Sequence, residues 1–236
     1  LLLSRARFVE NELLASAALA PLESIRLAAV THRYQRDSEE GIFELGPVAL
    51  ELRPGEVLFL VGGNGSGKTT LAKLLVGLYE PEGGHVLLNG RPVDGATRAS
   101  YRQQFSAVFA DFHLFDRLFG LGDSARAQRA AELLRALDLD HKVAIHDGEF
   151  STTQLSRGQQ KRMALLVACL EDRPAYVFDE WAADQDPAYK HLFYTQILPE
   201  LKARNKAVLV ITHDDRYFGV ADRLVKLEAG KLLAAV

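Results

Sequence analysis

The sequence contains few of the features that disulfide-bonded, membrane-spanning or nucleic-acid-binding proteins require. Its 236 residues include a single cysteine, Cys169, so no internal disulfide can form and a reducing compartment is expected. No run of eighteen apolar residues is present, which excludes a membrane-spanning helix from this stretch. The formal net charge is −3, so there is no overall basic field, and we expect no nucleic-acid partner.

The start of the chain suggests that it is a piece of a larger polypeptide. It begins at Leu1, and its only methionine is Met163. Residues 4–20 read as a helix that Pro21 ends, and we interpret residues 1–24 as a linker from a preceding membrane domain. The first helix of the domain itself is the alternative. Residues 25–236 have the length of one globular domain.

Residues 62–70 carry the most specific pattern in the chain, Gly-Gly-Asn-Gly-Ser-Gly-Lys-Thr-Thr. It matches G-x-x-x-x-G-K-T, the phosphate-binding P-loop pattern. The apolar run 57–61 before it reads as a buried strand, and leucines recur after it at helical spacing. Strand, glycine-rich loop and helix is the arrangement that the motif needs, because backbone N–H groups then face phosphate oxygens. A glycine-rich surface turn is the disfavoured alternative.

The chemistry of this loop predicts binding of a nucleoside triphosphate with Mg²⁺. Lys68 can place a positive charge on the β- and γ-phosphates, and Thr69 can offer its hydroxyl to the metal. The glycines let the backbone turn tightly around the anion. The predicted nucleotide-binding residues of the loop are Asn64, Gly65, Ser66, Gly67, Lys68, Thr69 and Thr70.

A second strand-like run, residues 175–178, ends in Asp179-Glu180. About 110 residues separate Lys68 from Asp179, which is far more than one crossover connection needs. We therefore expect an inserted, mostly helical subdomain between them. Asp179 could hold Mg²⁺ together with Thr69, and Glu180 could polarise an attacking water. A solvated acidic turn is the alternative.

Two aromatic side chains extend the candidate site. His213 follows the apolar run 207–211, at the edge where open α/β sheets bind ligands. It could donate a hydrogen bond to the γ-phosphate or be a structural histidine. Tyr34 precedes the P-loop at a distance that would let it stack on a base, although a half-buried core tyrosine is equally consistent.

Strands that alternate with helices predict an α/β fold. We expect a P-loop NTPase with a mostly parallel sheet flanked by helices, an antiparallel β part near the N-terminus and an inserted helical subdomain.

Together these motifs resemble the nucleotide-binding domain of ATP-binding cassette (ABC) ATPases. The segment 155–159, Leu-Ser-Arg-Gly-Gln, is similar to the LSGGQ signature of that family, and it opens a helix ahead of the strand that ends in Asp179-Glu180. The resemblance covers residues 25–236 and implies a Mg²⁺-dependent ATPase that converts ATP to ADP and phosphate. It implies a core of residues 25–97 and 172–236 around a helical subdomain at 98–171.

The resemblance also implies a second copy as partner. Two such domains meet head to tail in the family, and the signature residues Ser156, Gly158 and Gln159 then act on the nucleotide of the partner. Asp186 matches the D-loop aspartate of the family.

Other roles follow from the same resemblance. Tyr34 matches the base-stacking aromatic residue, and His213 matches the switch histidine. The implied catalytic residues are Glu180, His213 and Lys68, and the implied metal ligands are Thr69 and Asp179.

Three stretches, residues 105–116, 154–159 and 179–187, look like the cyclic-peptide and peptide-siderophore exporters, a group that includes the exporter of pyoverdine precursors. Members carry a membrane domain ahead of the cassette in one polypeptide. This likeness implies a transmembrane domain of the same polypeptide as partner. It also implies a place at the cytoplasmic face of the bacterial inner membrane and a peptide natural product as cargo.

One position departs from the family pattern, because the glutamine of the Q-loop falls at Ala110. Asp111 next to it is a candidate substitute. Two other function classes remain open. A soluble ABC ATPase acting on nucleic acid or ribosomes would predict basic tracts or long heptad arms. A nucleotide-gated dimerisation module with little turnover is disfavoured by Glu180, and a P-loop kinase by the segment 155–159.

Overall fold

The computed structural model describes residues 21–35, 42–112, 114, 124–146 and 148–233 of the chain. The expected linker falls almost wholly outside these ranges, since only its last four residues, 21–24, are described, and they are irregular. Within the described ranges, none of the helices combines the length and apolarity that crossing a membrane requires.

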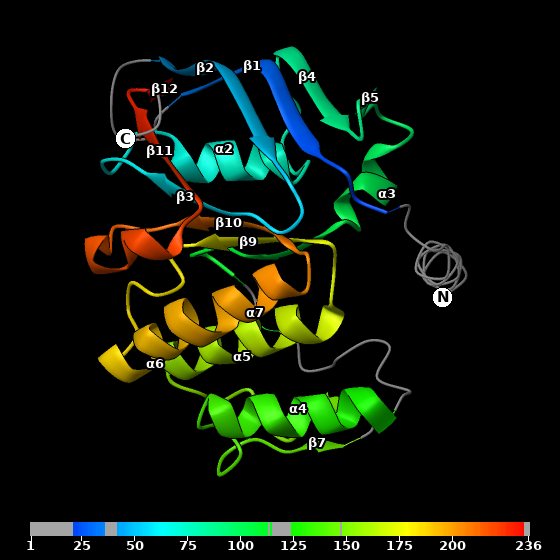
Figure 1. Ribbon diagram of the computed structural model, residues 1–236, viewed down its shortest axis with the longest axis vertical. Coiled ribbons are helices and arrows are strands. Elements are labelled where there is room, and N and C mark those ends of the chain that lie inside the picture. The colour runs from blue at the N-terminus through cyan, green and yellow to red at the C-terminus, as the bar shows by residue number, and fades with distance from the viewer. Residues whose placement is uncertain (1–20, 36–41, 113, 115–123, 147, 234–236) are drawn as a thin grey trace.

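A six-stranded sheet forms the centre of the fold (Figure 1). Its three middle strands are buried along their length apart from one residue at the end of β3, which is the pattern of parallel strands covered on both faces. β10 pairs in parallel with both β3 and β9, so the carboxyl ends of these strands meet at one edge. In spatial order the strands are β12 (Lys231–Leu233), β11 (Arg223–Glu228), β3 (Val57–Val61), β10 (Ala207–Ile211), β9 (Ala175–Asp179) and β6 (Phe105–Val108).

A second sheet, entirely antiparallel, covers the helix that follows the P-loop. This helix, α2 (Lys68–Leu75), lies between the two sheets (Figure 1). Its apolar residues Leu71 and Leu74 pack in one core with Leu27 and Leu45 of the second sheet. The strands of that sheet, in spatial order, are β2 (Ile42–Leu52), β1 (Ile25–Gln35), β4 (Gly83–Leu88) and β5 (Arg91–Pro92).

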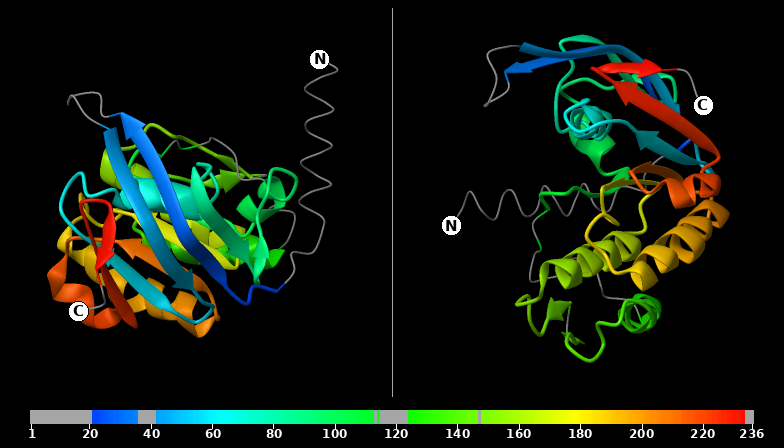
Figure 2. Two further views of the ribbon diagram at one scale, coloured as in Figure 1. Left: turned by 90° about the horizontal axis from the view of Figure 1, so that it is seen from above. Right: turned by 90° about the vertical axis from the view of Figure 1, so that its left-hand side faces the viewer.

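Helices cover the other face of the central sheet. The helix α5 (Arg157–Glu171) packs there beside a continuous helical stretch made of α6 (Pro187–Leu192), the π-helical η1 (Phe193–Ile197) and α7 (Leu198–Ala203). The helix α4 (Ser124–Ala136) packs on α5 and lies farther from the sheet (Figures 1 and 2). Aromatic side chains fill this core, and the ring of Trp181 lies 4.6 Å from that of Phe193.

Small elements complete the described chain. They are α3 (Arg98–Arg102), the hairpin of β7 (Ile145–His146) and β8 (Glu149–Phe150), and the 3-10 helix η2 (Asp215–Val220).

The predicted α/β class is confirmed, with its mostly parallel sheet and the antiparallel sheet near the N-terminus. The division into a core and a helical subdomain at 98–171 stays a prediction. β6 lies within that segment but pairs with β9 in the central sheet, so a helical subdomain would begin beyond Val108.

Candidate functional site

The P-loop connects β3 to α2 in a turn that only glycine fits. Gly62 has a φ of 151°, and a Cβ there would lie 2.1 Å from the carbonyl oxygen of Leu227. Gly67 has a φ of 102°, and a Cβ there would lie 3.1 Å from the ring of Phe43. Side chains at these positions would push the loop away from β11 and β2, so both glycines are required by close approach as well as by backbone conformation.

Lys68, the first residue of α2, lies across this loop and is buried. Its Nζ donates hydrogen bonds to the carbonyl oxygens of Gly62 at 2.8 Å and Gly63 at 3.0 Å. Burial lowers the pKa of Lys68, and the negative charges of Glu180 and Asp179 oppose that shift. A buried ammonium whose hydrogen bonds go to neutral carbonyls keeps a preference for an anionic ligand.

Thr69 and Asp179 bridge the P-loop and the end of β9. The Thr69 hydroxyl donates to Oδ2 of Asp179 at 2.8 Å. Asp179 is only 1% exposed, and burial, aided by the charge of Glu180, raises the pKa of its carboxyl group despite that hydrogen bond. Among the described residues, its Oδ1 has no hydrogen-bond partner.

These atoms fit a hard divalent cation. Magnesium takes oxygen ligands, and the site presents an unpartnered buried carboxylate oxygen beside a hydroxyl. The hydroxyl of Ser66 is likewise buried without a partner among the described residues, in a loop whose glycine backbone suits an anion. Mg²⁺ with a phosphate group is therefore compatible with the donor set.

Glu180 and His213 meet at the same edge of the central sheet. Each follows a parallel strand, Glu180 after β9 and His213 after β10. The His213 Nε2 lies 3.1 Å from Glu180 Oε1. A cavity of ≈ 260 Å³ opens beside both residues and is also lined by Tyr194 and Asp214.

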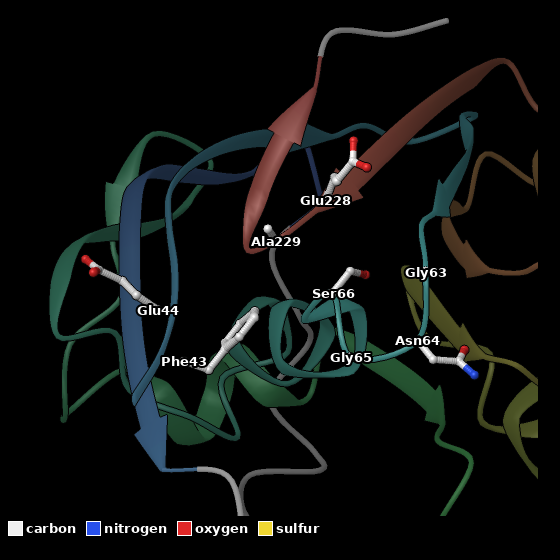
Figure 3. A pocket seen from close by; sticks show the side chains of 8 residues that line it. All are labelled: Phe43, Glu44, Gly63, Asn64, Gly65, Ser66, Glu228 and Ala229. Carbon is white, nitrogen blue, oxygen red and sulfur yellow. The ribbon is translucent and has the colours of Figure 1, made fainter. Parts of the chain in front are cut away.

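A larger open pocket of ≈ 460 Å³ lies beside the P-loop (Figure 3). It is lined by Phe43, Glu44, Gly63, Asn64, Gly65, Ser66, Glu228 and Ala229. The ring of Phe43 is directed towards the loop (Figure 3). Tyr34 does not line this pocket, but its ring centroid lies 5.2 Å from that of Phe43.

Phe43 was missed from the sequence because it is one aromatic residue in a strand. It lies opposite Tyr34 across β1 and β2, and only the register of these strands in the fold places the two rings side by side. The acidic residues Glu44 and Glu228 had no motif and could be found only from the fold.

The signature residues lie at the start of α5. Ser156 caps the helix, and its hydroxyl accepts from the Gln159 N–H while Gln159 Oε1 accepts from the Ser156 N–H. This reciprocal pair is a capping box. The Gly158 carbonyl accepts a hydrogen bond from Gln185 Nε2 at 3.2 Å. Asp186 caps α6 with its backbone, and its side chain makes no capping bond.

The structure thus brings five predicted residues together where the P-loop meets the ends of β9 and β10. They are Lys68, Thr69, Asp179, Glu180 and His213. The hydrogen bonds of Ser156, Gly158 and Gln159 instead stay within α5 and the segment before α6.

The position that departs from the family pattern has a polar neighbour. Asp111 follows the partly buried Ala110 and lies 3.5 Å from the ammonium of Lys73 on α2. The negative charge of Asp111 also contributes to the raised pKa of the Asp179 carboxyl group.

Comparisons with known proteins show the family and the fold of the chain. The model of the ABC transporter family matches residues 45–183. "ATP-binding protein SyrD" of Pseudomonas syringae pv. syringae is 50% identical over 216 residues, which are 90% of this chain and 38% of SyrD. "Macrolide export ATP-binding/permease protein MacB 1" of Yersinia pestis bv. Antiqua (strain Antiqua) is 30% identical over 92% of this chain and 34% of its own length. The chain spans little more than a third of either relative.

A solved structure has the same fold. The dimeric, post-hydrolysis ATP-binding cassette MJ0796, bound to ADP and Pi, matches with a TM-score of 0.74 and 24% identity over 90% of this chain and 97% of that chain. The family model covers more than half of the sequence, and the P-loop, the strand-end carboxylates and the fold all agree with it. This chain therefore belongs to the ABC transporter family and is an ATP-hydrolysing cassette of that family.

Proposed function

We propose that this cassette is the motor of an exporter, and that Lys68, Thr69, Asp179, Glu180 and His213 form its hydrolytic centre. The observation that carries the proposal is their convergence at one sheet edge, with Thr69 bonded to Asp179 and His213 next to Glu180. The similarity to MacB 1, a macrolide export protein, supports export as the process that hydrolysis drives.

The phosphates bind through the P-loop in this proposal. Lys68 exchanges the carbonyl oxygens of Gly62 and Gly63 for the β- and γ-phosphates, which satisfy its charge better. Backbone N–H groups of residues 64–70 and the N-terminus of α2 stabilise the same anion. Thr69 and Asp179 would hold Mg²⁺, which would neutralise charge on the phosphates.

Glu180 is the proposed general base. Water attacks the γ-phosphorus, the bond from that phosphorus to the bridging oxygen breaks, and the proton of the water passes to the Glu180 carboxylate. His213 holds that carboxylate at 3.1 Å, and we propose that its imidazole exchanges this contact for the γ-phosphate. Tyr34, backed by Phe43, supplies the aromatic surface for the base.

The complete site needs a second copy in this proposal. Ser156, Gly158 and Gln159 sit at the N-terminus of α5, where a helix favours an anion. They would contact the γ-phosphate held by the partner, with Asp186 at the same interface. ADP lacks that phosphate, so hydrolysis would remove the contacts and release the dimer.

The proposed cargo is a peptide natural product, either a siderophore precursor or a cyclic peptide. The support is the likeness of residues 105–116, 154–159 and 179–187 to exporters of that class. The same likeness supports a transmembrane domain in the same polypeptide and a place at the cytoplasmic face of the bacterial inner membrane.

The first test is the solution mass of Glu180→Gln with Mg-ATP and with Mg-ADP. We expect a dimer with ATP alone, because the variant binds ATP but cannot remove the γ-phosphate. Its turnover should fall by about a thousandfold or more, as expected when a general base is removed. Wild-type turnover in this variant would refute the assigned base, and a monomer with bound ATP would refute the sandwich.

A further inference from the structure

A buried lysine on α5 is not used by the hydrolytic centre described above. Lys161 lies one turn after the capping box, and its side chain is only 3% exposed. Its Nζ lies 2.8 Å from Oδ2 of Asp184 and donates to the carbonyl oxygen of Glu180 at 3.3 Å. An ammonium is costly to bury, so a lysine here requires these two partners to remain in place.

Asp184 is the exposed end of this pair. Its side chain is 59% exposed, and the hydrogen bond and charge of Lys161 hold the pKa of its carboxyl group below the ordinary value. Asp184 belongs to the segment between Glu180 and α6, so the pair joins α5 to the chain that follows β9. The Asp184 carboxylate can therefore pair with the Lys161 ammonium while the carboxylate itself stays accessible to solvent.

Two further hydrogen bonds tie the same segments together. The indole Nε1 of Trp181 donates to the carbonyl oxygen of Lys161 at 2.7 Å, and Gln185 Nε2 donates to that of Gly158 at 3.2 Å. Side chains from three of the five residues after Glu180 thus bond to the first turns of α5. A movement at the start of α5 would therefore shift the backbone of Glu180 and of the segment that follows it.

The backbone of Glu180 has an unfavourable conformation that neighbouring residues must stabilise. Its φ is 51°, a left-handed conformation that is uncommon for residues other than glycine. The Glu180 N–H donates to the Ile211 carbonyl oxygen at 3.1 Å, and the Glu180 carbonyl accepts from Lys161. The Glu180 carbonyl also accepts from the Ala183 N–H at 3.2 Å, so three hydrogen bonds hold the residue while its carboxylate lies against His213.

We propose that Lys161 is a positioning residue for ATP hydrolysis, which holds the Glu180 backbone so that its carboxylate stays in place and makes that placement depend on the signature helix α5. The inference rests on the proposed role of Glu180 as base. Lys161 does not touch the nucleotide in this account. Replacing Lys161 should therefore lower kcat without changing the affinity for ATP.

The test compares Lys161→Met with a matched lysine elsewhere in the full chain. Methionine keeps the length of the side chain and removes its charge. We expect kcat to fall by about a hundredfold, the effect of misplacing a catalytic group by about 1 Å, with KM and ATP affinity within about twofold of wild type. Unchanged kcat in a folded Lys161→Met protein would overturn the proposal.

Lys206 is the matched control. Its side chain is 14% exposed, and its Nζ lies 2.7 Å from Asp172 Oδ1 and 3.1 Å from the Asp172 carbonyl oxygen, the same pair of partner types. It precedes β10, at the opposite end of the sheet from the site. Lys206→Met should lower the melting temperature but leave kcat unchanged. An equal fall of kcat in both variants would mean that losing any buried lysine charge slows the enzyme, and would overturn the proposal.

Asp184→Asn covers the case in which Lys161→Met does not fold. It changes an exposed atom and leaves Lys161 present with a weaker partner, so we expect kcat to fall by about tenfold at constant ATP affinity. Wild-type kcat in this variant would overturn the proposal when Lys161→Met cannot be purified.

A double-mutant cycle separates this inference from the assignment of the base. In single-turnover experiments, Asp184→Asn or Lys161→Met should have no further effect on the residual hydrolysis of Glu180→Gln, because residues that act as a unit are not additive. An undiminished effect in that background would overturn the positioning role. Full activity of Glu180→Gln alone would instead refute the base itself.

Discussion

The two buried lysines of this cassette have opposite surroundings. Lys68 in the P-loop is held by the neutral carbonyl oxygens of Gly62 and Gly63, whereas Lys161 on α5 is paired with the carboxylate of Asp184. The charge of Lys68 is thus left available for a ligand. That of Lys161 is already neutralised within the chain.

The nearby aspartates differ in the same way. Asp179 is buried, has a raised pKa and, within the part of the chain that the structure describes, keeps one oxygen without a partner. Asp184 is exposed, has a lowered pKa and is bonded to Lys161. The incompletely paired Lys68 and Asp179 lie at the proposed site of ATP and Mg²⁺. The mutually paired Lys161 and Asp184 instead fix the position of the chain around Glu180 in our proposal.

The largest effect is expected from Lys68→Ala. Removing the cation proposed to contact the phosphates should weaken ATP binding by about a hundredfold or more, the loss expected for charged hydrogen bonds. Fluorescence titration with a nucleotide analogue measures the affinity, and Lys206→Ala serves as the control. If ATP affinity falls as far in Lys161→Met as in Lys68→Ala, the contrast between the two lysines is wrong.

Asp179→Asn tests the unsatisfied carboxylate by its effect on stability. The folded state raises the pKa of Asp179, so its ionised form disfavours folding above that raised pKa. Asparagine removes this charge, and we expect a higher melting temperature at neutral pH without Mg²⁺ and nucleotide. The gain should shrink as the pH falls through the raised folded-state pKa and disappear below 3.8, the ordinary value, where the carboxyl group is protonated in both states.

The same variant should lose activity, since Mg²⁺ prefers a carboxylate to an amide. Asp184→Asn is its counterpart and should lower the melting temperature at neutral pH, because Asp184 has a lowered pKa in the folded state. Thermal unfolding of both variants across pH measures whether each substitution raises or lowers the melting temperature. If both substitutions change the melting temperature in the same direction at neutral pH, the contrast between Asp179 and Asp184 is wrong.

Trp181→Phe should have the smallest effect. It removes the indole N–H that bonds to the Lys161 carbonyl but keeps an aromatic ring in the core. We expect the unfolding free energy to fall by about 0.5–1.5 kcal/mol, the net worth of one hydrogen bond, because the Lys161 carbonyl keeps its hydrogen bond within α5. Urea denaturation measures it, with Tyr189→Phe as a control that removes a hydroxyl bonded to exposed Asp138. If Trp181→Phe loses no more unfolding free energy than Tyr189→Phe, the hydrogen bond from Trp181 to the Lys161 carbonyl contributes little to stability.

The hydrolytic centre could be predicted because its parts are local or follow a simple topological rule. The P-loop encodes its own backbone, since its glycines allow the positive φ values at Gly62, Gly65 and Gly67. Asp179 ends β9, His213 lies two residues beyond the end of β10, and the carboxyl ends of parallel strands share an edge. No contact between distant side chains had to be known.

The Lys161 network could not be predicted in this way. Its bonds join the middle of a helix to an irregular segment, and neither carries a spacing rule that places one against the other. The same holds for Phe43, which reaches the P-loop only because β2 folds over α2 (Figure 3). The strand β6 was placed within a helical segment because a short apolar run does not reveal which sheet it joins.

The sequence by itself determined the family, the P-loop and the carboxylates at the end of β9, because short contiguous motifs specify local backbone and chemistry. The tertiary structure decided how charges are matched. Burial raises the pKa of Asp179 and lowers that of Lys68, while Asp184 neutralises Lys161. Burial and pairing depend on which segments pack together, and packing joins residues that lie far apart along the chain.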